Sequence, residues 1–421
     1  MSGRLWRHRD FLLLWGGQSV SAVGSAISLV VLPLIAVVSL HATGIEVGAL
    51  GAAEWLPWLL IGLPAGVWVD RSRRRLLMVG CDLVRMAGLA SIPIAAASGA
   101  LTLGQLYVVA FGVGLATVVF EVAYQAYLPT LVDSADLAEG NAKLQGTGAA
   151  ARVAGPGLGG LLVQFFRAPY AVVADAVSYG VSAIALLTIG RREPSPEETN
   201  RDLRREMAEG ARYVRHDPLL RILTISPAIA NFFFFGFSAI VVLFLVRTVH
   251  LAPTSIGLLV GGTAGGSVLG AALARPTGRR LGTARTLVFG LALTAPFGLL
   301  IPLTTRGAGL VFFVVGEFVM FVGILVYNIT ISAFRQSYCP PQLLGRIVAS
   351  MRFVVFGTMP VGALTGGALA DALGPRAAVW VLVAGNLLSG AVLVASPLRS
   401  MRDLPQRPAG LLSPEPSAAH T

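Results

Sequence analysis

The stretch Gly66-Val67-Trp68-Val69-Asp70-Arg71-Ser72-Arg73-Arg74-Arg75 decides the fold, because it is a short, strongly basic turn between two long apolar segments. A helix needs roughly 20 apolar residues to cross the ~30 Å hydrocarbon core of a bilayer. The segments on either side of the turn, 46–69 and 76–98, both reach that length. The turn therefore joins two membrane-spanning helices and predicts an integral membrane protein.

The composition of the 421-residue chain agrees with this prediction. The chain is 55% hydrophobic and only 13% charged, whereas an average soluble domain has roughly 25% charged residues. The net charge of +11 comes almost wholly from arginine, and Lys143 is the only lysine. These basic residues lie in short loops between apolar runs. They indicate lipid headgroups and membrane topology, and not nucleic acid, as the reason for the charge.

The same length criterion predicts twelve spans. They cover residues 11–40, 46–69, 76–98, 103–128, 142–166, 169–190, 219–249, 254–274, 285–303, 308–332, 344–370 and 377–397. Most basic residues are assigned to one side of the membrane. The exceptions are Arg167, Arg247, Arg306 and Arg376 on the other side and Arg152 within a span. Positively charged loops stay on the cytoplasmic side. We therefore expect a multi-pass protein of a bacterial inner (cytoplasmic) membrane, with both termini in the cytoplasm.

A charged segment, 191–217, divides the spans into two groups of six. We expect an N-terminal six-helix bundle in 1–190, a C-terminal six-helix bundle in 218–398, and a disordered cytoplasmic tail in 399–421. Within 191–217, apolar residues recur at helical spacing among arginines and glutamates. This pattern predicts a cytoplasmic linker with an amphipathic helix on the inner membrane surface.

The two halves show signs of an internal duplication. At one common offset Gly66 aligns with Gly270, and Pro156 falls beside Pro360. Parallel repeats of this kind occur in two-halved secondary transporters, which bind substrate between the halves. The predicted fold is an all-α integral membrane protein of twelve transmembrane helices in two pseudo-symmetric six-helix bundles.

The basic turn also matches a Gly-x-x-x-Asp-Arg-x-x-Arg/Lys-Arg/Lys pattern. The matching residues are Gly66, Asp70, Arg71, Arg74 and Arg75. In this loop and its twelve spans the chain resembles the major facilitator superfamily over residues 10–398, although Arg73 stands where glycine is usual. The resemblance implies a conformational latch of the outward-facing state, with Asp70 at the N-terminal end of the eleventh span and Arg74 paired with Glu121. The alternative is that the loop only anchors the topology.

The fifth span carries a second motif, which resembles the Gly-Pro-x-x-Gly-Gly motif of exporters in this superfamily. Its residues are Arg152, Gly155, Pro156, Gly159 and Gly160. Small residues let helices approach closely in lipid, and proline permits a bend. The resemblance therefore implies export, and the alternative is close packing without that meaning. The stretches 63–66 and 123–129 resemble bacterial drug and siderophore exporters, the branch that includes macrolide-efflux and enterobactin-export proteins.

Charged residues inside the spans are the strongest functional candidates, because each costs about 2.5–3.5 kcal/mol on insertion scales. Glu54, Glu317 and Arg152 fall about 12–15 Å from a helix end, near the midplane. Proton coupling needs a carboxyl group that changes protonation, and a nearby arginine favours the charged form. Glu54 and Glu317 have no arginine at helical spacing, so they are proton-coupling candidates, with a structural role as the alternative. We expect Glu121 to form a salt bridge with Arg74 or Arg152.

Asp82 and Arg85, three residues apart at the start of the third span, are expected to neutralise each other locally as a structural pair.

The resemblance implies a central cargo cavity lined by spans 1, 4, 7 and 10. The residues of these spans that we expect to line it are Gln18, Tyr124, Asn231, Phe232, Phe235 and Asn328. Because the four residues 232–235 are consecutive phenylalanines, they point in all directions around a helix, and about two at most can face a cavity. An aromatic, sparsely charged cavity suits amphipathic organic molecules. Lipid contact is the alternative fate of these rings.

The sequence lacks a phosphate-binding loop, a His-Glu-x-x-His motif and a nucleophile turn. We expect no enzyme activity, no metal, no cofactor and no obligate protein partner. The expected partners are the lipid bilayer, protons and a small organic substrate, with the proton gradient as the energy source. The predicted function is proton-coupled efflux, by antiport and alternating access, of small hydrophobic or amphipathic compounds such as drugs, antibiotics or siderophore-like metabolites. The alternatives are an importer of a small metabolite, a non-transporting sensor or scaffold on the same fold, or a lipid flippase.

Overall fold

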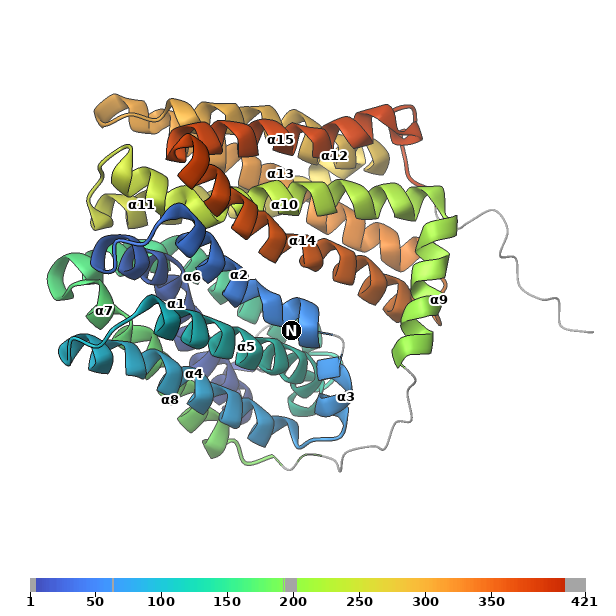
Figure 1. The fold of residues 1–421 in the computed structure, drawn as a ribbon. Coiled ribbons are helices and arrows are strands. Elements are labelled where there is room, and N and C mark those ends of the chain that lie inside the picture. Colours follow the sequence, from blue (N-terminus) through green and yellow to red (C-terminus); the bar gives the residue numbers. More distant parts are fainter. Residues whose placement is uncertain (1–4, 63, 192, 194–202, 406–421) are drawn as a thin grey trace, which may run out of the picture.

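The computed structural model describes residues 5–62, 64–191, 193 and 203–405, and the described part of the chain is helical without strands. Figure 1 shows its helices gathered in two stacked bundles, one from each half of the sequence. The two groups follow the division that the sequence predicts.

The first half contains six spans and two short helices. Their bounds are η1 (Leu5–Arg7), α1 (Arg9–Leu34) with η2 (Ile35–Ser39), α2 (Gly44–Ile61), α3 (Pro64–Asp70), α4 (Arg74–Ala97), α5 (Leu103–Leu131), α6 (Leu137–Phe166), and α7 (Ala168–Ala171) with α8 (Val173–Thr188). The connecting helix α9 (Leu203–His216) follows. The second half contains α10 (Pro218–Arg247), α11 (Pro253–Leu281), α12 (Thr283–Val288) with η3 (Phe289–Leu293) and η4 (Ala295–Leu303), η5 (Gly307–Gly309), α13 (Leu310–Tyr338), α14 (Leu344–Leu373), α15 (Pro375–Ala395) and η6 (Pro397–Arg399).

Among the described residues, eleven helical runs are long and apolar enough to cross a membrane. The remaining element of the expected set is α6, which has 30 residues. Its first turns are polar and carry Glu139 and Lys143, which form an ion pair at 2.8 Å. This polar beginning lowers its hydropathy, although its length suffices for a span. Together with α6, the described chain has the twelve span-length elements that the sequence predicts.

Two predicted spans are less regular than expected. The span predicted over 46–69 ends as α2 at Ile61, and α3 then begins separately at Pro64. The span predicted over 285–303 consists of an α-helical, a π-helical and a 3₁₀-helical segment in succession. Pro296 and Pro302 lie in the 3₁₀ segment. Proline removes a backbone hydrogen bond, which explains why a regular α-helix does not continue there.

Helix α9 lies across one end of the two bundles, which we call the α9 end, and the opposite end is the far end (Figure 1). Its described contacts include α14, where Arg346 forms an ion pair with Glu206 at 3.5 Å and a second, shorter one with Glu209. The Ser350 hydroxyl of α14 donates to the Met207 carbonyl at 3.2 Å. The helix that was predicted to lie on the inner membrane surface therefore also packs against the second half of the protein.

The chain after η6 is more ordered than expected. The Thr283 amide donates to Asp403 at 3.0 Å, and the Leu404 amide donates to the Thr283 hydroxyl at 2.8 Å. The prediction that disorder begins at residue 399 is therefore wrong for 399–405, because these residues are fixed against the start of α12. The rest of the predicted tail, 406–421, lies outside the described residues.

The buried apolar side chains show how the halves meet. One cluster contains residues of both halves, among them Val47 and Phe244. Two further clusters are confined to one half each: the first includes Phe11 of the N-terminal half, and the second includes Leu220 and Leu398 of the C-terminal half. The separate clusters lie toward the α9 end. The bundles therefore share a core at the far end and diverge toward α9.

Candidate functional site

Three adjoining chambers lie between and within the bundles. The N-chamber is lined by the N-terminal half and has a volume of about 420 Å³. The C-chamber is lined by the C-terminal half and has a volume of about 510 Å³. The middle chamber is lined by both halves and has a volume of about 260 Å³. Glu54 and Arg152 line both the N-chamber and the middle chamber. Phe234 and Phe235 line both the middle chamber and the C-chamber. Neighbouring chambers therefore share parts of their walls, and the three together reach from one half to the other.

The two proton-coupling candidates face the same chamber from different halves. Glu54 on α2 and Glu317 on α13 both line the middle chamber. Glu317 is only 5% exposed, and it accepts a hydrogen bond of 2.7 Å from the Thr263 hydroxyl of α11. Arg152 lines this chamber too, but among the described residues no ion pair joins it to either glutamate. Both carboxyl groups thus face the cavity and not lipid.

A charged pair is buried in the N-terminal half. Asp82 and Arg85 of α4 form a close ion pair, as expected, with side-chain exposures of 0% and 5%. The Arg85 guanidinium also lies over the rings of Phe120 and Tyr179, 4.2 Å from each ring centroid. Burial of this charge is tolerable because a carboxylate and two aromatic faces surround it.

Asp175 belongs to the same polar region. The residue is 1% exposed, and its carboxylate accepts hydrogen bonds from Ser28 at 2.5 Å and from Ser178 at 3.1 Å. Asp175 and Arg85 both line the N-chamber. This chamber therefore has charges of both signs on its wall.

The basic turn predicted as a latch sits at the α9 end. Gly66 and Asp70 lie on α3, which packs against α5 of its own half. Arg74 donates to the Ala126 carbonyl at 3.2 Å, and the Arg75 guanidinium donates to the Ile189 carbonyl. These contacts hold the loop within the N-terminal bundle. The first turns of α14, the predicted partner of the latch, pack against α9.

The predicted salt bridge of Glu121 is absent in this conformation. Among the described residues, no ion pair joins Glu121 to Arg74 or to Arg152. Glu121 is half-buried and lines the N-chamber. The Arg74 guanidinium donates to the Ala126 carbonyl of α5. The pairing with Arg74 was predicted from the resemblance, since Glu121 is the one acidic residue of its span. In the structure Arg74 begins α4, and its guanidinium is taken up by a backbone carbonyl of α5.

The glycines of the motif in α6 serve two helix contacts. Gly155 packs against Ala26 of α1, in its own half, at a separation that leaves no room for a side chain. The carbonyl oxygen of Pro156 lies against Gly257 of α11, in the other half. The remaining glycines extend these contacts, Gly159 toward α1 and Gly160 toward α11. The motif is thus a close-packed contact both within one half and between the halves.

Hydrogen bonds join the halves at the far end. The Asp371 carboxylate of α14 accepts from the amides of Gly44 at 2.6 Å and Ile45 at 2.8 Å, the first residues of α2. A carboxylate at this position is favoured by the partial positive charge of a helix N-terminus. Arg247 of α10 donates to the Ala42 carbonyl at 2.7 Å. The far end is therefore closed by contacts between backbone and charged side chains.

Aromatic rings bridge the halves beside the chambers. Trp55 of α2 meets Phe235 of α10 edge to face at 4.8 Å, and Trp58 meets Phe356 of α14 at 5.5 Å. Sequence reasoning did not single out either tryptophan. No signal in the sequence separates them from rings that face lipid, because α2 is apolar over most of its length.

Four of the six residues predicted to line a cargo cavity lie on chamber walls. Those that line a chamber are Gln18, Asn231, Phe235 and Asn328. Tyr124 and Phe232 lie outside these three chambers, because Tyr124 stacks on Phe120 at 6.3 Å and the Phe232 backbone packs against Gly362. Phe234 takes the place expected of Phe232. Two rings of the phenylalanine run face the cavity, in agreement with the limit that helical geometry sets.

A two-bundle membrane protein with a central cavity that is closed at one end has the architecture of a secondary transporter. The family model described as transmembrane secretion effector matches residues 5–420. The chain therefore belongs to this family of the major facilitator superfamily, and it is a multi-pass membrane protein. Proteins of this superfamily are transporters and not enzymes.

Two characterised relatives cover nearly the whole chain. Macrolide efflux protein A of Streptococcus pyogenes is 24% identical over 401 residues, which are 94% of this chain and 97% of the relative. Multidrug efflux pump Tap of Mycolicibacterium fortuitum is 26% identical over 413 residues, 94% and 98% of the two chains.

Solved structures share the fold at lower identity. The nucleoside transporter NupG superposes with a TM-score of 0.77 at 12% identity, covering 92% of this chain and 98% of its own. A bacterial homologue of the iron transporter ferroportin in an inward-facing state superposes with a TM-score of 0.70 at 17% identity, covering 93% and 99%. At these identities the likeness concerns the fold alone.

Proposed function

We propose that the protein exports small amphipathic organic compounds, such as drugs, antibiotics or siderophore-like metabolites, in exchange for protons. The observation that carries this proposal is the pair Glu54 and Glu317, which meet at one chamber from opposite halves. The relatives named as efflux proteins support the direction of transport. Alternating access moves the halves against each other. The surroundings of a site built from both halves therefore change whenever the protein switches between its inward-open and outward-open states.

We infer that the α9 end faces the cytoplasm, so that the conformation described is open inward and both termini are cytoplasmic. The basic turn 71–75 and the arginines Arg279 and Arg280 at the end of α11 lie at this end. Positively charged segments remain on the cytoplasmic side of a membrane. An inward-open state is the one in which an exporter takes up cargo from the cytoplasm.

In the proposed cycle, cargo enters the cavity from the α9 end, and the far end then opens. Opening separates Asp371 from the start of α2 and slides α11 along the glycines of α6, with Pro156 and Pro360 as the points where α6 and α14 bend. Protons bind the glutamates from outside as cargo leaves. A ligand drives such a change only by binding one state better than the other, and here protonation and cargo would favour opposite states.

The test is transport into and out of proteoliposomes with an imposed pH gradient. Flux of a panel of aromatic amphiphiles is compared for the wild type, Glu54→Gln, Glu317→Gln and the double variant. We expect the double variant to lose at least about tenfold of its gradient-driven flux, because its chamber can no longer exchange a proton. Glu139→Gln is the matched control, since Glu139 lies outside the three chambers in an ion pair with Lys143.

The outcomes separate the parts of the proposal. Unchanged gradient-driven flux in the double variant would remove the role of the two glutamates. Flux that runs inward against the expected direction would replace export by uptake. If no compound moves under any gradient while the protein binds ligands, a sensor or scaffold role would stand in place of transport.

A further inference from the structure

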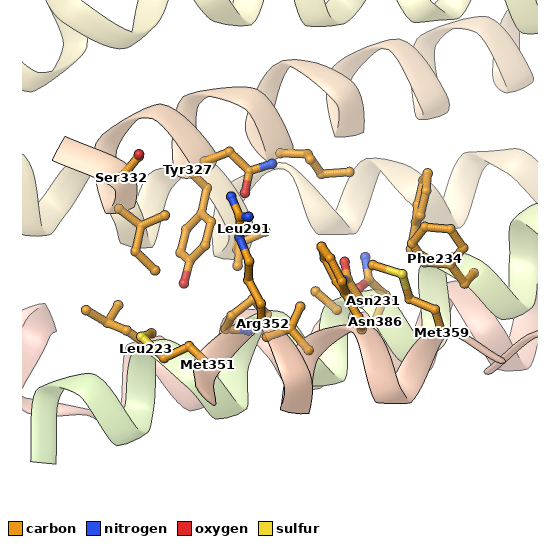
Figure 2. A pocket seen from close by; sticks show the side chains of 18 of the residues that line it. Leu223, Asn231, Phe234, Leu291, Tyr327, Ser332, Met351, Arg352, Met359 and Asn386 are labelled. Atoms are coloured by element: carbon orange, nitrogen blue, oxygen red, sulfur yellow. The ribbon is translucent and has the colours of Figure 1, made fainter. Parts of the chain in front are cut away.

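The C-chamber has an unusual charge. Arg335, in the last turn of α13, and Arg352, near the start of α14, both line it. No aspartate or glutamate stands among the described residues of its wall. Neither arginine forms an ion pair with a described residue. Figure 2 shows Arg352 reaching from its helix into the chamber. Two cations thus share one cavity, and the described part of the chain supplies no counter-charge there.

Two buried polar groups of the same wall also have no partner. The Tyr327 hydroxyl and the Asn386 side-chain oxygen make no hydrogen bond to any described residue, although the two side chains are only 2% and 7% exposed. Both residues line the C-chamber (Figure 2). Buried polar groups are nearly always hydrogen-bonded, and leaving one unpaired is costly. Both residues belong to the wall of the chamber, so a ligand bound there can supply a partner when these side chains turn toward it.

The rest of the chamber is apolar and aromatic. Phe234, Phe321 and Phe356 line it together with Met359. The volume of about 510 Å³ lies within the range of cavities that hold drug-sized ligands. The chamber therefore offers a cationic end and an aromatic end to one molecule.

We propose that the C-chamber binds the anionic head of an amphipathic aromatic compound, a carboxylate in the simplest case. Arg335 and Arg352 donate charge-assisted hydrogen bonds to the anion, and the Tyr327 hydroxyl donates a third. Asn386 accepts a hydrogen bond from a hydroxyl group of the ligand. The phenylalanines contact its apolar part. In treating this ligand as cargo the inference rests on the proposed export function, whereas binding itself does not.

The same arginines have a competing explanation. In a state closed at the α9 end they could pair with carboxylates of the N-terminal half and stabilise that state only. If the arginines had this role, replacing them would change the equilibrium between the state that is closed at the α9 end and the state that is open there. The affinity for an anionic ligand and for its neutral analogue would then change by the same factor.

The test compares three matched probes: 1-naphthaleneacetate, its neutral amide 1-naphthaleneacetamide, and the cationic 1-naphthylmethylamine. Their binding to the full-length protein in zwitterionic lipid nanodiscs is measured by titration calorimetry without a gradient. We expect the acetate to bind best. Arg335→Gln and Arg352→Gln should each weaken acetate binding by about tenfold and amide binding by less than about twofold.

Three further variants control the result. Arg335→Lys keeps the charge and should retain part of the preference for the acetate. Tyr327→Phe removes only the hydroxyl group and should weaken acetate binding by about threefold. Arg279→Gln changes an exposed arginine at the same end of the same half, outside the three chambers, and should leave all three affinities unchanged.

Equal binding of the acetate and the amide by the wild type would overturn the inference. A parallel loss of both affinities in the glutamine variants would overturn it in favour of arginines that stabilise the state closed at the α9 end. If the acetate preference is found but no gradient-driven flux occurs, the export function fails and the anion site stands. If cationic or neutral compounds are transported but the acetate is not preferred, the export function stands and the anion site fails.

Discussion

The N-chamber and the C-chamber occupy equivalent places in two halves of one repeated fold, yet their charges differ. Three carboxylates and two arginines line the N-chamber, where Asp82 further compensates Arg85. The wall of the C-chamber carries two arginines and, among its described residues, no carboxylate. The fold depends on span length and on small residues at helix contacts, both of which the halves share. Chamber charges do not affect these features, so they are free to differ between the halves.

The largest expected difference between the halves is in stability. Arg85→Gln should lower the free energy of unfolding by about 3–5 kcal/mol, because it leaves the buried Asp82 carboxylate without its partner. Arg352→Gln should cost much less, because Arg352 is exposed to the cavity and pairs with no described carboxylate. Unfolding of both purified variants by denaturant in the same detergent measures the difference. Adding Asp82→Asn to Arg85→Gln should recover much of the loss; equal costs for Arg85 and Arg352 would refute the contrast between the chambers.

A carboxylate introduced into the C-chamber should make the charge of this chamber more similar to that of the N-chamber. Ser332 lines the C-chamber and is half-buried, so Ser332→Glu would set a carboxylate beside the arginines. We expect acetate binding to fall by about tenfold and binding of the cationic naphthylmethylamine to rise, measured with the probes described above. Ser332→Gln is the control of similar size, and it should change the two affinities much less. An unaltered preference in Ser332→Glu would show that the chamber charge does not select the ligand.

Asp371 at the far end and Asp70 at the α9 end offer a comparison between the two ends. Asp371→Asn should favour opening of the far end by about 1 kcal/mol, roughly a fivefold change in the equilibrium, because it removes a carboxylate from the α2 N-terminus. Labelling of a cysteine introduced into the middle chamber, in a background without Cys81 and Cys339, reports the accessibility from outside. Asp70→Asn should not increase this labelling. Equal labelling of the wild type and Asp371→Asn would mean that the far end is held by packing alone.

The smallest effect is expected where α9 meets α14. Glu206→Gln and Glu209→Gln remove ion pairs with Arg346 that are about one third exposed. Pairs of this kind contribute about 0–1 kcal/mol. We expect a decrease of no more than about 2 °C in the midpoint of thermal unfolding. A larger decrease would show that α9 is an integral part of the C-terminal bundle, with no counterpart in the N-terminal one.

Several features of the site could be predicted from the sequence because they involve a rare residue in an apolar context. A carboxyl group within a span is costly, so Glu54 and Glu317 stand out, and both do line the middle chamber. Asp82 and Arg85 stand three residues apart on one helix and form the expected pair. The pairing of Glu121 could not be predicted in the same way, because its candidate partners Arg74 and Arg152 lie on other helices, α4 and α6, and their position relative to α5 depends on helix packing.

The sequence by itself determined the spans, their division into two halves and the small-residue contacts of α6, because membrane-spanning length and close helix approach demand particular residues locally. Only the tertiary structure decided that Phe234 and not Phe232 faces the cavity, that Trp55 bridges the halves, and that Arg335 and Arg352 share a chamber. The reason is that lipid tails are as apolar as a protein core. A ring that faces lipid and a ring that faces cargo therefore leave the same trace in the sequence, and only the packing of helices distinguishes them.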